Sequence, residues 1–244
     1  MTRHKLIPMM KETRLKDLKA ELSKRRNPAK AKVLQGFFKT GPGEYAEGDI
    51  FLGIEVPVLR GLAKQYSGLS FADTLRLLAS GIHEERLLAL LLLILQYQSS
   101  GRPGRHKIYK AYLRHTRYIN NWDLVDLTAR QIVGDYLYDK EKAVLYRLAR
   151  SVSLWERRIA IVATFHFIER KQFRDTLKVA EILLSDEHDL IHKAAGWMLR
   201  EVGKRDRAEE ERFLKKHYKT MPRTMLRYAI ERFPESKRQA YLNG

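Results

Sequence analysis

The chain has 244 residues, of which 47 are Lys or Arg and 29 are Asp or Glu, so its formal net charge is +18 at pH 7. This excess favours a polyanionic partner, most often nucleic acid, because neutralised phosphates release their counterions; a merely soluble basic surface is the alternative. The absence of cysteine excludes disulfides, thiolate nucleophiles and Cys-ligated metal sites.

The N-terminal stretch MTRHKLIPMMKETRLKDLKAELSKRR has neither the apolar segment nor the cleavage site of a secretory signal. The longest apolar run, LLALLLLIL at 87–95, is too short to span a membrane and is expected to be core. We therefore expect an intracellular, cytoplasmic protein with no membrane partner.

Apolar residues recur at helical spacing, and no segment alternates convincingly as a strand does. Helices are predicted, in chain order, at 9–26, 28–39, 56–66, 71–80, 83–98, 105–117, 122–137, 141–150, 153–169, 173–184, 188–204, 206–218 and 222–233. The breaks between them contain Pro, Gly, Ser or Asp, as in the loops KTGPGEYAEGD at 39–49 and SSGRPGR at 99–105.

Long helices beginning near residues 83, 122, 153 and 188 are each followed by a shorter, more polar helix. A small residue falls at a comparable point in each: Ala89, Ala129, Ala160 and Ala195. A two-helix unit with this period predicts an all-α, HEAT-like helical-repeat solenoid, an α-α superhelix with a concave basic face suited to a nucleic-acid duplex. We expect one domain over 1–244, with 1–23 as an appended basic helix or tail.

The predicted helix 188–204 places Trp197 away from its apolar stripe, on the side that carries Lys193, Arg200 and Lys204. Trp197 therefore belongs either to a basic binding face or to a contact with a neighbouring repeat, since solenoid helices are buried on two sides.

Trp122, Asp126 and Arg130 follow the margin of the apolar face of 122–137, four residues apart. On the residues alone, Asp126 is either a partner for a neighbouring arginine or a catalytic carboxylate. In the predicted helix 153–169, Arg158 falls near the middle of the apolar stripe, where an unpaired guanidinium is prohibitively costly. It pairs with a carboxylate of the adjacent repeat or holds a phosphate. Because Arg158 follows Asp126 by about one repeat, stacking would bring the two together.

Four segments in order, FLGIEVPVLRGLAK (51–64), NWDLVDLTARQIVGDYL (121–137), SLWERRIAIV (153–162) and HKAAGWMLREVGK (192–204), resemble the AlkD-like DNA alkylation repair family, as does NPAKA at 27–31. The resemblance covers about residues 24–235. It implies a HEAT-like solenoid that cradles double-stranded DNA and excises cationic alkylated purines such as 3-methyladenine and 7-methylguanine. The products are the free base and an abasic site.

Carried over by motif, the family's catalytic aspartate matches Asp126, its two sugar-facing tryptophans match Trp122 and Trp197, and its arginine matches Arg158. The chain departs from some members at Asn121, where they carry a second aromatic residue, and at Glu55, where they carry Gln. Further residues expected to bind DNA are Arg157, Lys193, Arg200 and Lys204.

The chemistry agrees with these residue types. An N-alkylated purine already carries positive charge and leaves neutral, so no general acid is needed. Asp126 can stabilise the oxocarbenium-like sugar and orient a water, two indole faces can add cation–π contacts, and Arg158 would hold a backbone phosphate. The resemblance also implies that the damaged base need not be flipped into a deep pocket.

Neither a metal nor a cofactor is expected. His188 and His192 lie four residues apart, but no third ligand stands near them. The other hypothesis is a non-catalytic HEAT-repeat module that binds DNA, RNA or an acidic protein. The joint presence of Trp122, Asp126, Arg158 and Trp197 favours the enzyme. A monomer is expected, because a single lesion is recognised.

Overall fold

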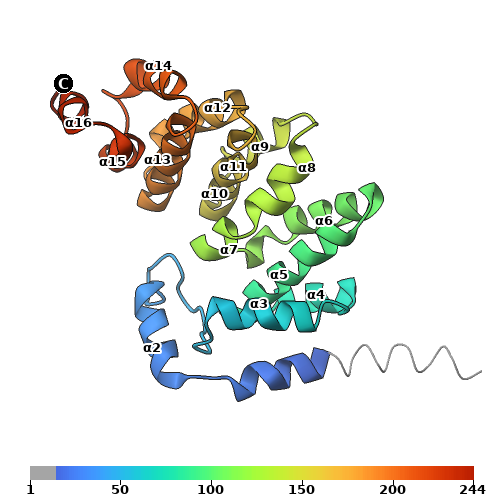
Figure 1. Cartoon of the computed structure of the whole chain (residues 1–244). Helices are drawn as coiled ribbons and strands as arrows, with labels where there is room; N and C mark the ends of the chain where they lie inside the picture. Colours follow the sequence, from blue (N-terminus) through green and yellow to red (C-terminus); the bar gives the residue numbers. More distant parts are fainter. Residues whose placement is uncertain (1–14) are drawn as a thin grey trace, which may run out of the picture. The chain divides into compact units, whose positions relative to one another are not determined.

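A computed structural model describes residues 15–244 (Figure 1). Over these residues the chain is an all-α helical-repeat protein without a strand, which confirms the predicted fold class. The start of the predicted helix 9–26, and most of the predicted extension 1–23, lie outside the described residues. The chain divides into two compact units, the first ending at Leu124 and the second covering Val125–Gly244. The expectations of one domain and of a concave basic face stay predictions.

Unit 1 contains a helix over 15–24 and the whole of the long apolar run at 87–95. Its further elements are α2 (Pro28–Phe37), α3 (Val56–Gln65), α4 (Phe71–Leu78), α5 (His83–Ser99), α6 (Arg102–Arg114) and the 3-10 turn η1 (Thr116–Tyr118). Helix α5 packs against α3, α4 and α6, so every residue from Leu87 to Ile94 is buried. An apolar helix without a polar face requires such enclosure.

The loop before α3 is tied to α5 by one buried carboxylate. Glu84, in the first turn of α5, accepts hydrogen bonds from the backbone N–H groups of Leu52, Gly53 and Ile54. Gly53 has φ +82°, and a Cβ there would lie 2.2 Å from the carbonyl oxygen of Asn27. Only glycine fits this approach, and it keeps the end of the loop against α2.

Unit 2 continues the repeat around α10 and α13. Its elements are α7 (Trp122–Asp126, which begins in unit 1), the π-helical turn η2 (Arg130–Gly134), α8 (Asp135–Leu137), α9 (Ala143–Leu148), α10 (Leu154–Ala163), α11 (Phe165–Ile168), α12 (Arg174–Ile182), the 3-10 turn η3 (Leu183–Ser185), α13 (Asp189–Gly203), α14 (Arg207–His217), α15 (Arg223–Ala229), the 3-10 turn η4 (Ile230–Arg232) and α16 (Glu235–Asn243). Helix α13 packs against α10, α14 and α15, so it is the centre of the unit.

The structure differs from the predicted helices at several places, of which three matter most here. The helix predicted over 122–137 is divided into α7, η2 and α8, because its hydrogen bonding changes to the π pattern at Arg130. The helix predicted over 153–169 is interrupted at Thr164, whose hydroxyl donates to the carbonyl of Ile161. The final helix, α16, was not predicted; it has no buried residue, so it lacks the apolar stripe that marks a helix in sequence.

Gly134 allows η2 to approach the next repeat. A Cβ at Gly134 would lie 2.3 Å from the carbonyl oxygen of Ala163 and 2.8 Å from Cβ of His166. We expect Gly134→Ala to lower the free energy of unfolding by about 1–3 kcal/mol, measured by urea denaturation, because the helices must separate.

The matched control is Gly61→Ala in α3, where a Cβ would meet nothing within 4 Å. That variant should be neutral or more stable by up to about 1 kcal/mol. Equal stabilities for the two variants would contradict the close approach.

Candidate active site

Asp126 and Arg158 form an ion pair inside unit 2. The Nε atom of Arg158 donates to Oδ1 of Asp126 at 2.8 Å, and Nη2 donates to Oδ2 at 2.7 Å. Arg158 is 5% exposed and donates its third group, Nη1, to the carbonyl oxygen of Leu190. The guanidinium therefore joins the end of α7 to the start of α13. Of the two partners considered for Arg158, the structure has the carboxylate.

This arrangement differs from the expected contact between Arg158 and a DNA phosphate, because the Nε, Nη1 and Nη2 atoms all donate to protein acceptors. A two-point bond between guanidinium and carboxylate also fixes the plane of the carboxylate. The side chain of Asp126 remains 18% exposed, three times the 6% of Arg158. Arg158 thus holds a carboxylate whose side chain is partly exposed.

Trp197 lies partly exposed on α13, and its ring centroid is 5.7 Å from that of Phe165 on α11. The guanidinium groups of Arg130 and Arg205 lie 5.2 and 5.6 Å from the Phe165 ring. Trp197 therefore contacts a neighbouring helix through Phe165, a ring that also lies beside two arginines. Both expectations for Trp197, a contact with a neighbouring repeat and a place near basic residues, have support in the structure.

The four residues expected to bind DNA all have carboxylate partners. Lys193 pairs with Asp189 and Lys204 with Glu201, each at 2.6 Å, while Arg200 pairs with Glu231 and Arg157 with Asp186. The lysine side chains are 42% and 39% exposed, whereas those of Arg157 and Arg200 are 19% and 18% exposed. The Lys193–Asp189 pair is exposed on both sides and contributes little free energy, so Lys193 can exchange its partner for a phosphate at low cost. The partner of Lys204, Glu201, is only 8% exposed, but it also pairs with Arg205.

Trp122 lies in an aromatic stack in unit 1. Its ring is nearly parallel to that of Phe38, with centroids 5.1 Å apart and an interplanar angle of 15°, and Phe38 in turn stacks on Phe51. The edge of Phe37 faces Trp122 at 5.9 Å. The backbone N–H of Trp122 donates to the side-chain oxygen of the buried Asn121 at 2.8 Å. Asn121 therefore supports the start of α7 instead of supplying a second aromatic surface.

A buried ionic network beside Trp122 was not predicted. The two ring nitrogens of His83 bond to Asp49 at 2.9 Å and to Asp123 at 2.8 Å, and Arg86 donates to Asp49 at 2.6 Å. Burial opposes the charged imidazole, but the hydrogen bonds from Asp123 and Asp49 outweigh it and raise the pKa of His83 to about 9. In the sequence, the only signals are the aspartate after Trp122 and a histidine opening an apolar helix.

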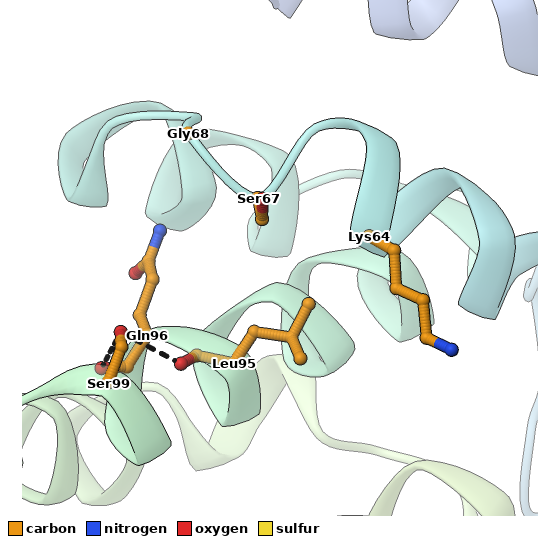
Figure 2. Close-up of a pocket in the computed structure, with 6 residues that line it drawn as sticks. All are labelled: Lys64, Ser67, Gly68, Leu95, Gln96 and Ser99. Atoms are coloured by element: carbon orange, nitrogen blue, oxygen red, sulfur yellow. Dashed lines mark hydrogen bonds between the residues drawn. The ribbon is translucent and has the colours of Figure 1, made fainter.

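Two pockets lie in unit 1. One, of about 350 Å³, has an aromatic wall formed by Phe37, Phe38 and Phe51, with His83 and Asp123 also lining it. The other, of about 430 Å³, lies between the end of α3 and the end of α5 and contains no predicted site residue (Figure 2). There the hydroxyl of Ser99 bonds to the carbonyl groups of Leu95 and Gln96 in its own helix. The Lys64 side chain points away from Ser99 (Figure 2).

His188 and His192 have local roles. His188 caps α13 by accepting from the backbone N–H of Leu190, and His192 bonds to the carbonyl oxygen of Asp186. Within residues 15–244, no group of three or more His, Cys, Asp or Glu side chains could hold a metal ion. None of the helices in this range is both long and apolar enough to cross a membrane.

A comparison with protein-family models identifies one family. The sequence model described as DNA alkylation repair enzyme matches residues 18–233. A solved structure described as a predicted DNA alkylation repair enzyme from Enterococcus faecalis shares the fold, with a TM-score of 0.66 over 86% of this chain and 97% of that chain, at 18% identity. A search of curated proteins gives no significant match.

The His83 network predicts a pH-dependent stability. The folded-state pKa of His83, about 9, exceeds the ordinary value of 6.5, so its stabilisation is complete below pH 6.5 and is lost as pH rises through 9. The loss should be on the order of 3 kcal/mol between pH 6.5 and 9.5, measured by urea denaturation.

His83→Phe should remove this component while keeping the ring. Glu210, whose pKa burial raises to about 8, also titrates in the range, but it affects both proteins equally. The difference between the two pH profiles therefore isolates His83, and parallel profiles would contradict the charged network.

Proposed function

The chain belongs to the DNA alkylation repair enzyme family, and from this membership we propose that it is a DNA N-glycosylase that starts base excision repair. Its substrates are cationic alkylated purines, such as 3-methyladenine and 7-methylguanine, in double-stranded DNA held by a HEAT-like solenoid. The observation that supports this proposal most is the two-point ion pair by which Arg158 holds Asp126, whose side chain is partly exposed.

The reaction breaks the bond between the sugar C1′ and the nitrogen of the alkylated base. The electron pair goes to the base, which is already cationic and leaves neutral, so no protonation of the leaving group is required. Positive charge develops on the sugar, and a carboxylate at fixed distance stabilises this charge more than it stabilises the neutral starting sugar. Asp126 has this role, and it also orients the water that attacks C1′.

Arg158 acts through Asp126. With its donors on Asp126 and Leu190, it holds the carboxylate plane in one orientation and connects α7 to α13, the helix that carries Trp197. An oriented carboxylate needs no reorganisation when charge appears on the sugar. We therefore assign Arg158 as a positioning residue.

The tryptophans supply aromatic surfaces for the charged sugar. Trp122 and Asp126 are the first and last residues of α7, one helical turn apart, and Trp197 lies partly exposed on α13. An indole face attracts a cation more strongly than other aromatic rings do. This scheme does not require the base to be flipped into a pocket.

Duplex DNA is bound through the basic surface of α13, and the monomer is sufficient for a single lesion. Lys193 and Lys204 are the exposed members of this surface. A non-catalytic nucleic-acid-binding module would use the same lysines, so DNA binding alone does not separate the two functions.

Asp126→Asn separates them. The amide keeps the shape of the side chain but removes the negative charge, so base release from methylated duplex DNA should fall about 10²–10³-fold in single-turnover assays, with DNA affinity preserved. The control is Asp206→Asn at the N-cap of α14, where Asn caps as well as Asp, and it should retain full activity. If the native protein and Asp126→Asn bind DNA equally and the native protein releases no base, the chain is the non-catalytic module.

Salt dependence tests the binding surface. Lys193→Ala and Lys204→Ala should each reduce the slope of log K against log salt by about 1, because each removes one phosphate contact. Lys216→Ala, which removes an exposed lysine paired with Glu181 on another helix, should leave the slope unchanged. The same slope in all four proteins would place the DNA elsewhere.

A further inference from the structure

Both neighbours of Trp122 in the sequence are held by buried side chains. Asn121 is fully buried; it accepts the N–H of Trp122 at 2.8 Å and approaches Asp49 at 3.5 Å. On the other side, Oδ2 of Asp123 bonds to Nε2 of His83 at 2.8 Å. The other oxygen of Asp123, Oδ1, is buried and accepts no hydrogen bond within the described part of the chain. His83 is therefore the side-chain group that anchors Asp123.

The second ring nitrogen of His83 connects this segment to the loop at 39–49. Nδ1 bonds to Asp49, the last residue of the loop, at 2.9 Å, and Asp49 also accepts from Arg86. His83, Asp49, Asp123 and Arg86 are each less than 9% exposed. The loop thus supplies a buried carboxylate that fixes the imidazole ring.

The aromatic stack also connects His83 to Trp122. The His83 ring lies 4.3 Å from the ring of Phe51 and 5.2 Å from that of Phe38, measured between centroids. Phe38 is the ring on which Trp122 stacks, at 5.1 Å. His83 therefore reaches Trp122 in two ways, by hydrogen bonds through the backbone of α7 and by ring contacts through Phe38.

Stability alone does not account for this arrangement. Replacing a buried ion pair by well-packed apolar residues is often neutral or stabilising, because the charges must first lose their hydration. What a buried polar network adds is a restriction on geometry, since each donor requires its acceptor at one distance and angle. Here the restriction falls on the residues that flank Trp122.

We propose that His83 is a positioning residue that, together with Asp49, holds the segment Asn121–Asp123 so that the Trp122 indole keeps the orientation used against the sugar. The inference rests on the proposed glycosylase function for the use of Trp122, and it adds residues from the 39–49 loop and the start of α5. Without His83, Asp49 and Asp123 lose their shared cation, and the start of α7 is released.

The experiment labels the protein with 5-fluorotryptophan. The chain has three tryptophans, Trp122, Trp155 and Trp197, so three ¹⁹F resonances are expected, and Trp122→Phe assigns the first. His83→Phe should shift or broaden the Trp122 resonance and leave the other two in place. Single-turnover base release should fall about 10–100-fold with DNA affinity within twofold, because displacements near 1 Å have that effect on rate.

The matched control is Thr74→Val. Thr74 is fully buried in unit 1, donates to the carbonyl of Ser70 and accepts from Gln96. Within residues 15–244, none of these three residues forms a hydrogen bond or ion pair with His83, Asp49, Asp123 or Arg86. Thr74→Val should lower the melting temperature while leaving the Trp122 resonance and the rate unchanged. If His83→Phe behaves like Thr74→Val, His83 is only structural and the proposal is overturned.

Asp49→Asn is a milder second variant, because it keeps the shape and removes only the charge. It should move the Trp122 resonance in the same direction as His83→Phe and by a smaller amount, and an unmoved resonance would overturn the proposal even if His83→Phe does not fold. Failure of the glycosylase function is seen separately, as absence of base release by the native protein. In that case the resonances still decide whether His83 positions Trp122.

Discussion

A guanidinium group inside an apolar helix face must have an anion, and in unit 2 that requirement joins Arg158 to Asp126. This ion pair contains two parallel hydrogen bonds, which fix both the position and the plane of the Asp126 carboxylate. Its third contact, to the carbonyl of Leu190, extends the connection to α13. The order of α7, α10 and α13 in the unit thus depends on an arginine whose charge is satisfied by the proposed catalytic group.

Unit 1 uses the same physical principle with a different cation. His83 lies between Asp49 and Asp123 as Arg158 lies beside Asp126, and in both units the ionic contact is made next to a tryptophan-bearing helix. The two cations differ in one respect. Arginine stays charged at all accessible pH values, whereas the imidazole depends on its two carboxylates for its raised pKa. The ionic contact that supports Trp122 therefore depends on His83 staying protonated, whereas the arginine that holds Asp126 keeps its charge.

Helical periodicity was enough to predict the fold class and the partner of Arg158. The stripe of 153–169 marks Arg158 as buried, and a repeat of about thirty residues places Asp126 beside it. The π-turn at Arg130 could not be predicted, because the apolar pattern continues through it. The His83 network could not be predicted from the sequence either, because Asp49 comes from a loop whose path no periodicity determines. The functional roles came from resemblance to a family, and the phosphate contact expected of Arg158 stays a prediction beside the bonds that its guanidinium makes to Asp126 and Leu190.

The most direct test is a double-mutant cycle on base release from methylated duplex DNA, comparing Asp126→Asn, Arg158→Met and the double variant under single-turnover conditions. If Arg158 acts by positioning Asp126, the double variant should release base no more slowly than Asp126→Asn alone, because the second change removes a support that no longer matters. Multiplied losses in the double variant would contradict this, since Arg158 would then contribute independently of the carboxylate it holds.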